Sequence, residues 1–599
     1  MAENEVIPAL VKHLQGPPLG EGDKCGEFCQ HEVEKASAHA LRLFAMKPEH
    51  QQLVVDSGAL THLLNLLKRH KAGSSSQSVN GLILGAAEAI SRILLRNSSA
   101  SILVRMEGGI PLLVELLDAN DVNVQVAAVM ALIPMAWENK ENGNQIVDSG
   151  ALPRIVLILQ SDNADIQVKA VALIKFLVCK NSNIVKDVLA AGGLQPIIGL
   201  LSSSCVWSQM AAAYLVKQFA AAHSVRKDIV QMGAVRPLIE MLRSPKVEAR
   251  ILSASALRRL AQDSDTQVGI IHDDGLPALL GLLDSESELL MDVAVCALHT
   301  LLNNEENVSD FITIGGFWKL HRGEFTGRAK ESCARTLESL KKKIHGQVLE
   351  GLVYLMKVLE KAIQERIAFA LAHLCSPLDH QMIFLDNSGL ELLLGLLTST
   401  CPQQQLDGGE ALFMLASNPM CPLPPTQVNL RKQYKKKPMP YDVTFWVEGQ
   451  QFYAHKFLLS ASSDAFHAMF YGNYQEKDAT EVEIPDIRQE VFAAMMRFIY
   501  TGSVDITMDI AQDLLKASDQ YLMEELKRLC QGAIAEGLSL ENVANILKFS
   551  EDAYATSLKK SCILFILKHF AEFRQRYSDL IQGIVPTIRE YFLEMLTSI

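Results

Sequence analysis

A chain of 599 residues is too long for one hydrophobic core, so it is divided into several domains or built as a repeat array. Apolar residues make up 49% of the chain and aromatic residues only 6%, a composition that indicates an ordered, helix-rich protein. The net charge of −12 argues against a general nucleic-acid binder, so we expect no direct contact with nucleic acid.

The eleven cysteines are scattered, and the first ten residues do not resemble a signal peptide, so we expect reduced thiols in the nucleus and cytoplasm. One long uncharged run, residues 188–216, contains Gly192, Pro196 and three serines. These helix breakers predict two helices and a turn rather than a membrane span. Catalytic motifs are missing, and Cys25, Cys29 and the nearby histidines lack paired zinc-site spacing. We therefore expect no enzyme activity, metal, cofactor or membrane partner.

Residues 1–417 repeat a small-residue turn followed by a Leu-rich helix, as in SGALTHLLNLL (57–67) and GGIPLLVELL (108–117). Equivalent apolar positions are 50, 42, 42, 41, 41 and 41 residues apart between Leu60 and Phe317, and Leu349 and Leu390 are again 41 apart. A period near 41 is typical of armadillo or HEAT arrays. A short extra helix before each glycine turn, as at 144–147, favours the three-helix armadillo repeat. The Gly-, Pro- or Ser-rich insertions at 16–27 and 72–78 predict surface loops.

The third helices of an armadillo array line its concave groove, so their side chains are candidate client ligands. Importin-like arrays carry an asparagine ladder there, but the equivalent positions hold Ile93, Pro134, Phe176, Gln218, Arg259, Thr300 and His373. That substitution disfavours a transport receptor. One position earlier lies a basic row, Arg92, Lys175, Lys217, Arg258 and His299. The row predicts a groove for an acidic or phosphorylated segment, and an ordinary solvated helix face remains the alternative.

Residues 418–440 read as a linker, because their six prolines forbid a helix across most of the segment. The basic run from Arg431 to Lys437 is either a nuclear import signal or a solvated hinge. Val428, Leu430 and Tyr434 are apolar residues near the end of this segment, just upstream of the next domain.

Residues 441–502 begin with alternating apolar residues from Val443 to Val447 and a turn at 448–450, followed by helix-spaced apolar runs. This order predicts a strand hairpin that leads into helices, an α+β unit. The motifs DVT (442–444), FYAHK (452–456), AMF (468–470) and FIYTG (498–502) resemble the BTB/POZ domain. That resemblance makes Asp442, His455 and Lys456 motif residues and implies protein binding and a homodimer or heterodimer. His455 has no accompanying nucleophile motif, so we expect a structural imidazole.

Amphipathic helices continue after the BTB-like stretch, and LSLENVANIL (538–547) is similar to the start of the BACK-type extension of MATH-BTB ubiquitin-ligase adaptors. The sequence therefore predicts a mostly α protein: an armadillo-repeat α-solenoid (1–417), a linker (418–440), an α+β BTB/POZ domain (441–535) and a helical BACK-like extension (536–599). Trp446 and Ser460 depart from the BTB pattern, and we expect both in the packed core of the domain.

The combination of array and BTB domain resembles the plant armadillo-BTB proteins that bind abscisic-acid-response bZIP transcription factors, through stretches such as PEHQQLVVDSGAL (48–60) and MMRFIYTGSVDIT (495–507). The resemblance implies a nuclear regulator of transcription with a bZIP client. We expect an adaptor that presents the client to a cullin-RING ubiquitin ligase. A non-degradative transcriptional scaffold in hormone signalling is the alternative.

BTB adaptors that bind a cullin carry an apolar residue, any residue and then Glu after the Ala-Met-Phe helix. The segment AMFYGNYQEKDATEVEIPD (468–486) places Tyr474 and Glu476 on this motif. The resemblance therefore implies that Tyr474 fills an apolar pocket on the cullin and that Glu476 accepts hydrogen bonds at its rim.

Overall fold

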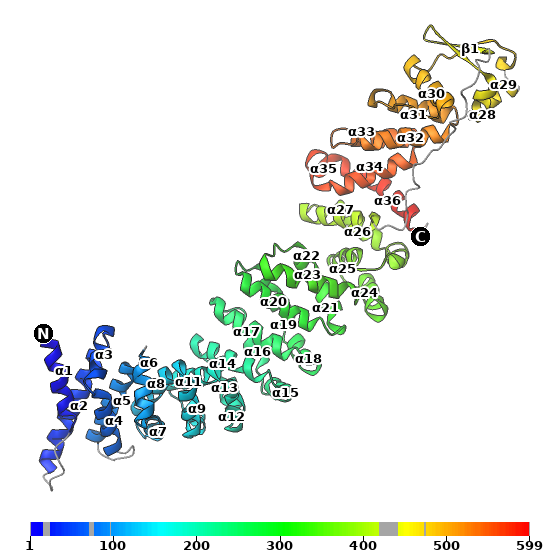
Figure 1. Ribbon diagram of the computed structural model, residues 1–599. Coiled ribbons are helices and arrows are strands. Elements are labelled where there is room, and N and C mark those ends of the chain that lie inside the picture. Colours follow the sequence, from blue (N-terminus) through cyan, green and yellow to red (C-terminus); the bar gives the residue numbers. More distant parts are fainter. Residues whose placement is uncertain are drawn as a thin grey trace. The chain divides into compact units, whose positions relative to one another are not determined.

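The computed structural model describes residues 2–15, 24–70, 77–95, 97–417, 441–472 and 475–597 (Figure 1). Two compact units are resolved, unit 1 from Met1 to Leu340 and unit 2 from Lys341 to Ile599. The predicted linker, with its basic run and Val428, Leu430 and Tyr434, lies outside the described residues, as does Tyr474.

Unit 1 is a stack of three-helix repeats, as the period of 41 residues predicted (Figure 1). A helix α1 (Ala2–His13) and a long helix α2 (Lys24–Ala45) precede the first complete repeat. The first helices are α3 (Pro48–Asp56), α6 (Ser98–Met106), α9 (Lys140–Asp148), α12 (Ile184–Ala190), α15 (His223–Gln231), α18 (Ser264–His272) and α21 (Glu306–Thr313). The second helices are α4 (Ala59–Arg69), α7 (Gly109–Glu115), α10 (Ala151–Leu159), α13 (Leu194–Gly199), α16 (Val235–Met241), α19 (Gly275–Gly281) and α22 (Gly316–Arg322). The third helices are α5 (Gln77–Leu94), α8 (Val122–Glu138), α11 (Ala164–Lys180), α14 (Val206–Phe219), α17 (Val247–Leu260), α20 (Glu288–Leu301) and α23 (Gly327–Lys341).

The turn between the first and second helices explains the repeated small residues. One residue there takes a left-handed conformation, which suits glycine because it has no Cβ. Asp274 adopts this conformation in one repeat, with φ 61°, although a glycine follows it. The next residue must be small for a different reason: a Cβ added to Gly316 would lie 2.3 Å from the buried ring of Phe311. The other left-handed turn residues of unit 1 are Gly58, Gly108, Gly150, Gly192, Gly233 and Gly315.

Replacing Gly316 with alanine is expected to lower the free energy of unfolding by about 1–3 kcal/mol, the usual effect of overpacking a core. Gly281→Ala is the matched control, because Gly281 is also a second-helix glycine of unit 1 and has nothing within 4 Å of an added Cβ. Thermal unfolding of the two full-length variants tests the difference. A Gly316→Ala midpoint equal to that of Gly281→Ala would contradict the close approach to Phe311.

Two sequence predictions about unit 1 need adjustment. Within the predicted loops at 16–27 and 72–78, the described residues 24–27 and 77–78 are helical, because α2 begins at Lys24 and α5 at Gln77. The remaining residues of both segments lie outside the described residues. The uncharged run at 188–216 spans parts of three helices and the 3-10 turn η2 (Leu200–Ser202), not two helices. In the part of the chain that the structure describes, no single helix is long and apolar enough to cross a membrane. The pair Ile184–Ala190 and Leu194–Ser202 meets that criterion only when joined, and it is bent by 97°. Two further 3-10 turns are η1 (Leu116–Asp118) and η3 (Leu282–Asp284).

Unit 2 begins with two more repeats, both of which depart from the regular pattern. The first of these repeats has no first helix: a connection of four residues leads from α23 directly to α24 (Gly346–Val358). The missing helix accounts for the short interval of 32 residues between Phe317 and Leu349. Helix α24 is followed by α25 (Lys361–Leu374) and the turn η4 (Pro377–Asp379). In the last repeat a π-helix, η5 (Gln381–Asp386), replaces the first helix, and Ser388 takes the left-handed turn conformation with φ 60°. The helices α26 (Gly389–Leu397) and α27 (Pro402–Ala416) complete it.

The predicted strand hairpin consists of β1 (Val443–Val447) and β2 (Gln450–Ala454), which are antiparallel; β3 (Glu481–Glu483) pairs with β1 in parallel. The strand order is β2-β1-β3, with Phe445 opposite Phe452 and Val482. Phe445 is fully buried and packs on Phe466 and Phe492. The helices of this part are α28 (Lys456–Ser462), α29 (Asp464–Tyr471), η6 (Gln475–Lys477), α30 (Gln489–Thr501), α31 (Met508–Gln520) and α32 (Glu524–Glu536).

Neither residue that departs from the BTB pattern lies in the closed core. Side chains alternate across a strand, so Trp446 lies on the opposite face of β1 from Phe445, half-buried, and its Nε1 donates to Glu481 at 3.3 Å. Ser460 is also half-buried, and its hydroxyl donates to the Lys456 carbonyl oxygen at 2.7 Å. The expectation of core positions was therefore wrong, and both residues are compatible with the fold.

The C-terminal helices pack directly against the last repeat (Figure 1). Helix α27 contacts α34 (Thr556–Lys568) and α35 (Phe570–Arg576), while α26 contacts α36 (Ile581–Thr597). The approach is close because α27 has a glycine at the contact: a Cβ on Gly409 would lie 2.7 Å from the ring of Phe570 on α35. The preceding Gly408 faces α26 instead, where an added Cβ would lie 2.9 Å from Leu396. Arg589 Nε also contacts Glu391 Oε1 at 2.6 Å. Helix α33 (Val543–Asp552) and the turn η7 (Ser578–Leu580) complete this part.

Candidate functional site: the third-helix face

The third helices of unit 1 form one continuous surface, because each helix from α5 to α20 packs against the next (Figure 1). A constant period places equivalent residues on the same side of successive helices. Arg92 is exposed on α5, and the other members of the predicted row are partly exposed on α11, α14, α17 and α20: Lys175, Lys217, Arg258 and His299. The row is interrupted at α8, where Ile133 occupies the equivalent position.

Three cations gather on α14 and α17. Burial, and then the positive charges of Arg259 and Arg258, lower the pKa of Lys217 below its usual value. Within the described residues, none of the three side chains has a carboxylate within ion-pair distance. An unneutralised cluster of this kind attracts an anionic ligand, because a negative charge placed there relieves the mutual repulsion. We call Lys217, Arg258 and Arg259 the basic cluster.

Beside it lies a group of rings and lysines on α8, α11 and α14, which we call the aromatic cluster. The rings of Trp137 and Phe176 are perpendicular, with centroids 4.9 Å apart. Lys180 Nζ lies 5.3 Å from the Trp137 centroid, and Lys175 Nζ lies 5.8 Å and 5.9 Å from Phe176 and Tyr214. Trp137 is 52% exposed. Exposed rings and lysines offer a ligand apolar contact and positive charge together.

The basic row predicted only part of this surface, since it omitted Trp137, Phe176, Tyr214 and Arg259. A signal was present, because Phe176 and Arg259 occupy the positions of the importin asparagine ladder. Burial, followed by the neighbouring Cys179 thiol, raises the pKa of Tyr214 to about 12. Its hydroxyl therefore keeps its proton at neutral pH and can donate a hydrogen bond to a ligand.

The three BTB motif residues hold the junction between β2 and α28. Asp442 Oδ1 accepts from the backbone N–H of Lys456 at 2.8 Å, at the first turn of α28. The backbone N–H of His455 donates to the Tyr500 hydroxyl at 2.9 Å, and its Nδ1 lies at the same distance from that oxygen. These contacts agree with a structural imidazole. The three motif residues thus have structural roles at the junction of β2 and α28. Their contacts do not place any of them as a reactive group.

The segment expected to bind a cullin is described only in part. Glu476 lies half-exposed in the turn η6, which packs against α29. Lys456 Nζ donates to the Lys477 carbonyl oxygen at 3.0 Å and so ties this turn to the BTB motif. The role of Tyr474 and Glu476 remains a prediction.

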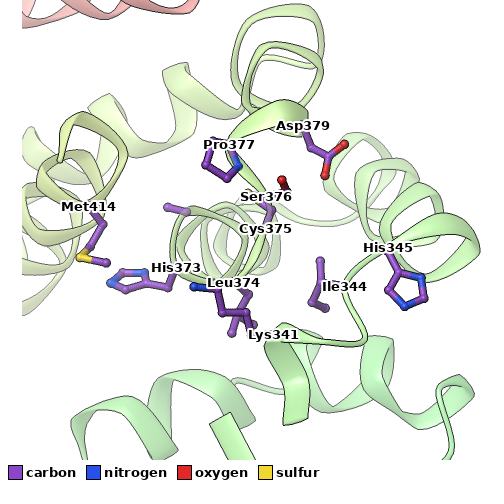
Figure 2. A pocket seen from close by; sticks show the side chains of 11 residues that line it. Lys341, Ile344, His345, His373, Leu374, Cys375, Ser376, Pro377, Asp379 and Met414 are labelled. Carbon is purple, nitrogen blue, oxygen red and sulfur yellow. The ribbon is translucent and has the colours of Figure 1, made fainter. Parts of the chain in front are cut away.

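A separate hollow of about 390 Å³ lies at the end of α25 (Figure 2). His373, Cys375 and Asp379 line it, together with Met414 from α27. Burial, and then the charge of Asp379, raise the pKa of the Cys375 thiol to about 12, which leaves it protonated and weakly nucleophilic. His373 Nδ1 lies 2.9 Å from the Phe369 carbonyl oxygen. The Cys375 thiol in this hollow is therefore not an activated nucleophile.

Comparisons with known proteins agree with the observed architecture. The BTB/POZ domain family matches residues 430–538. An Arabidopsis thaliana protein named "ARM repeat protein interacting with ABF2" is 53% identical over 609 residues, covering 100% of this chain and 86% of the relative. The chain belongs to this family of armadillo-repeat BTB/POZ proteins. A second Arabidopsis relative, "Armadillo BTB Arabidopsis protein 1", is 44% identical over 610 residues, covering 100% of this chain and 83% of its own length.

Solved structures resemble parts of this armadillo-repeat BTB/POZ protein. A crystallised engineered protein is 26% identical and covers 69% of this chain and 99% of itself, with a TM-score of 0.49. A designed armadillo repeat protein is 25% identical and covers 42% of this chain and 99% of itself, with a TM-score of 0.37. Armadillo and BTB modules are typically interaction modules without catalysis, so the architecture is that of a protein-interaction adaptor.

Proposed function

We propose that this protein captures an acidic segment of a transcription regulator on its third-helix face and recruits a cullin ubiquitin ligase through its BTB/POZ module. The observation that carries the client half is the basic cluster, three cations that lack a carboxylate partner among the described residues. The aromatic cluster extends it into a surface that favours acidic residues interspersed with apolar ones. The chain as a whole has a net charge of −12, so this local positive surface contrasts with the overall negative charge.

The client that we propose is a bZIP transcription factor. One relative is named for its interaction with ABF2, and the relative is 53% identical to this chain along its whole length. The family resemblance points to the same class of factor. An adaptor for such a client would act in the nucleus and cytoplasm.

The double variant Lys217→Glu with Arg258→Glu is expected to weaken binding of purified ABF2 about tenfold or more, because it replaces attraction with repulsion at the cluster. Both side chains are partly exposed, so the array should remain folded. Binding by the wild-type protein should also weaken as salt is added, since exposed charges are screened. Isothermal titration of the full-length chain at two salt concentrations measures both effects.

Lys186→Glu with Arg236→Glu is the matched control, since it makes the same charge change at exposed positions on the first and second helices α12 and α16. The control should bind as wild type does. Equal affinities for the control and the Lys217/Arg258 variant would place the client elsewhere.

The cullin half of the proposal rests on the BTB/POZ module and on Glu476, which is half-exposed in a turn that Lys456 anchors. We also propose that the module dimerises. Phe457 on α28 is 69% exposed and Tyr453 on β2 is 53% exposed, so the module presents large apolar side chains to a partner copy.

A further inference from the structure

Cys205 lies at a point where the backbone favours a thiolate. It is the residue that precedes α14, with the extended conformation φ −89° and ψ 112° of a helix N-cap. The thiol makes no capping hydrogen bond, but the nearby backbone N–H groups of Ser208 and Trp207, in the first turn, lower the pKa of Cys205. A side chain in this position meets unpaired N–H groups and the positive end of the helix dipole, which stabilise negative charge.

Two side chains add to this environment independently of the helix end. Ser208 is only 1% exposed, and its hydroxyl has no hydrogen-bond partner among the described residues, while it is close enough to the Cys205 thiol to contribute to the lowered pKa of that thiol. Lys246 Nζ lies 4.1 Å from the ring centroid of Trp207 and so brings a positive charge close to the same turn. A buried hydroxyl without an oxygen or nitrogen partner is unusual, and a negatively charged group at Cys205 would supply the missing acceptor.

We propose that Cys205 is a modification site, a thiol that hydroperoxides oxidise and that a small thiol then caps as a mixed disulfide. The Cys205 thiolate attacks one peroxide oxygen, the O–O bond breaks and an S–O bond forms. The sulfur is oxidised to a sulfenic acid, and hydrogen peroxide is reduced to hydroxide, which takes a proton from solvent to form water. A thiol of the glutathione class then displaces water from the sulfenic acid and forms the S–S bond.

The geometry supports each requirement of this chemistry. The thiol is partly exposed, so a small oxidant can reach it. The N–H groups of Ser208 and Trp207, together with the Ser208 hydroxyl and the charge of Lys246, lower the pKa of Cys205 against the raising effect of its partial burial. The thiolate is the reactive form of cysteine, so a larger fraction of Cys205 is reactive near neutral pH. The same donors can hold the oxygen of the oxidised sulfur.

The chain contains its own control for this proposal. Cys401 is the N-cap of α27, the same structural position in the last repeat, and it is more exposed than Cys205. Gln404 stands where α14 has Ser208, and the Gln404 side chain is hydrogen-bonded to the Ser399 hydroxyl. The two cysteines therefore occupy the same position before a third helix but differ in the residue three positions later, Ser208 in one case and Gln404 in the other.

The test treats the full-length protein with dilute hydrogen peroxide near neutral pH, traps sulfenic acid with dimedone and quantifies each cysteine by peptide mass spectrometry. Labelling of Cys205 should exceed that of Cys401 roughly fivefold to tenfold. In Ser208→Ala and Lys246→Met the excess should shrink, and the pH profile of Cys205 alkylation by iodoacetamide should move to higher pH. Circular dichroism of each variant checks that the fold is retained. Equal labelling of the two cysteines, or labelling unchanged in folded Ser208→Ala and Lys246→Met, would overturn the proposal.

Discussion

Replacing Gly409 with tryptophan is expected to lower the free energy of unfolding of unit 2 by about 3 kcal/mol or more, at the upper end of overpacking effects. An added Cβ already lies 2.7 Å from the ring of Phe570, which is itself 3% exposed and cannot move into solvent without leaving its core. A bulky indole would therefore separate α27 from α34 and α35. Both helix faces would then expose apolar surface, so the variant should unfold at lower temperature and aggregate more readily.

Gly395→Trp is the matched control. Gly395 lies on α26 of the same repeat, and an added Cβ there has nothing within 4 Å. Differential scanning calorimetry of the two full-length variants, combined with limited proteolysis, gives the comparison. If both variants melt together and resist protease equally, the docking of the C-terminal helices on the last repeat is not a stabilising contact.

The second large effect concerns the cullin. Tyr474→Ala with Glu476→Lys is expected to reduce cullin affinity more than tenfold, because truncating a central aromatic anchor typically costs about 2 kcal/mol or more. The charge reversal also removes the carboxylate that would accept hydrogen bonds at the pocket rim. Client binding and BTB dimerisation should persist, since neither surface includes these residues. Binding of each variant to an immobilised cullin N-terminal domain gives the cullin affinity, and light scattering gives the oligomeric state of the variant.

The array offers a control with the same residue types. Tyr354 is 63% exposed on α24 and Glu350 is exposed one turn earlier, so Tyr354→Ala with Glu350→Lys changes side-chain bulk and charge equally. This control should retain full cullin affinity. If the Tyr474/Glu476 variant also retains it, the proposed motif is not the binding site. A wild-type protein that binds no cullin would favour the non-degradative transcriptional scaffold.

The sequence predicted the features of this molecule that depend on local patterning. The turn before each Leu-rich helix and the period of 41 residues predicted three-helix repeats, and the alternation from Val443 to Val447 predicted β1. The family resemblance predicted Trp446 in the packed core, but the alternation along β1 places it on the face opposite Phe445, where it is half-buried.

Long-range packing could not be read from the sequence. The contact of Gly409 with Phe570 joins helices that are distant in the chain, and a glycine pair in a helix does not indicate which partner approaches it. The aromatic cluster was missed for a related reason: Trp137 lies on α8, where Ile133 interrupts the basic row. Only the stacking of α8 on α11 brings Trp137 against Phe176.

The central claim is that one chain carries a client and a cullin together, and co-purification of the full-length protein with both tests it most directly. A tagged cullin N-terminal domain, incubated with the chain and with ABF2, should retain ABF2 only when the chain is present. The Lys217/Arg258 variant should then bind the cullin but no longer bind ABF2. The Tyr474/Glu476 variant should bind ABF2 but no longer bind the cullin. Failure of the wild-type chain to bridge the two proteins, although it binds each of them separately, would contradict the account.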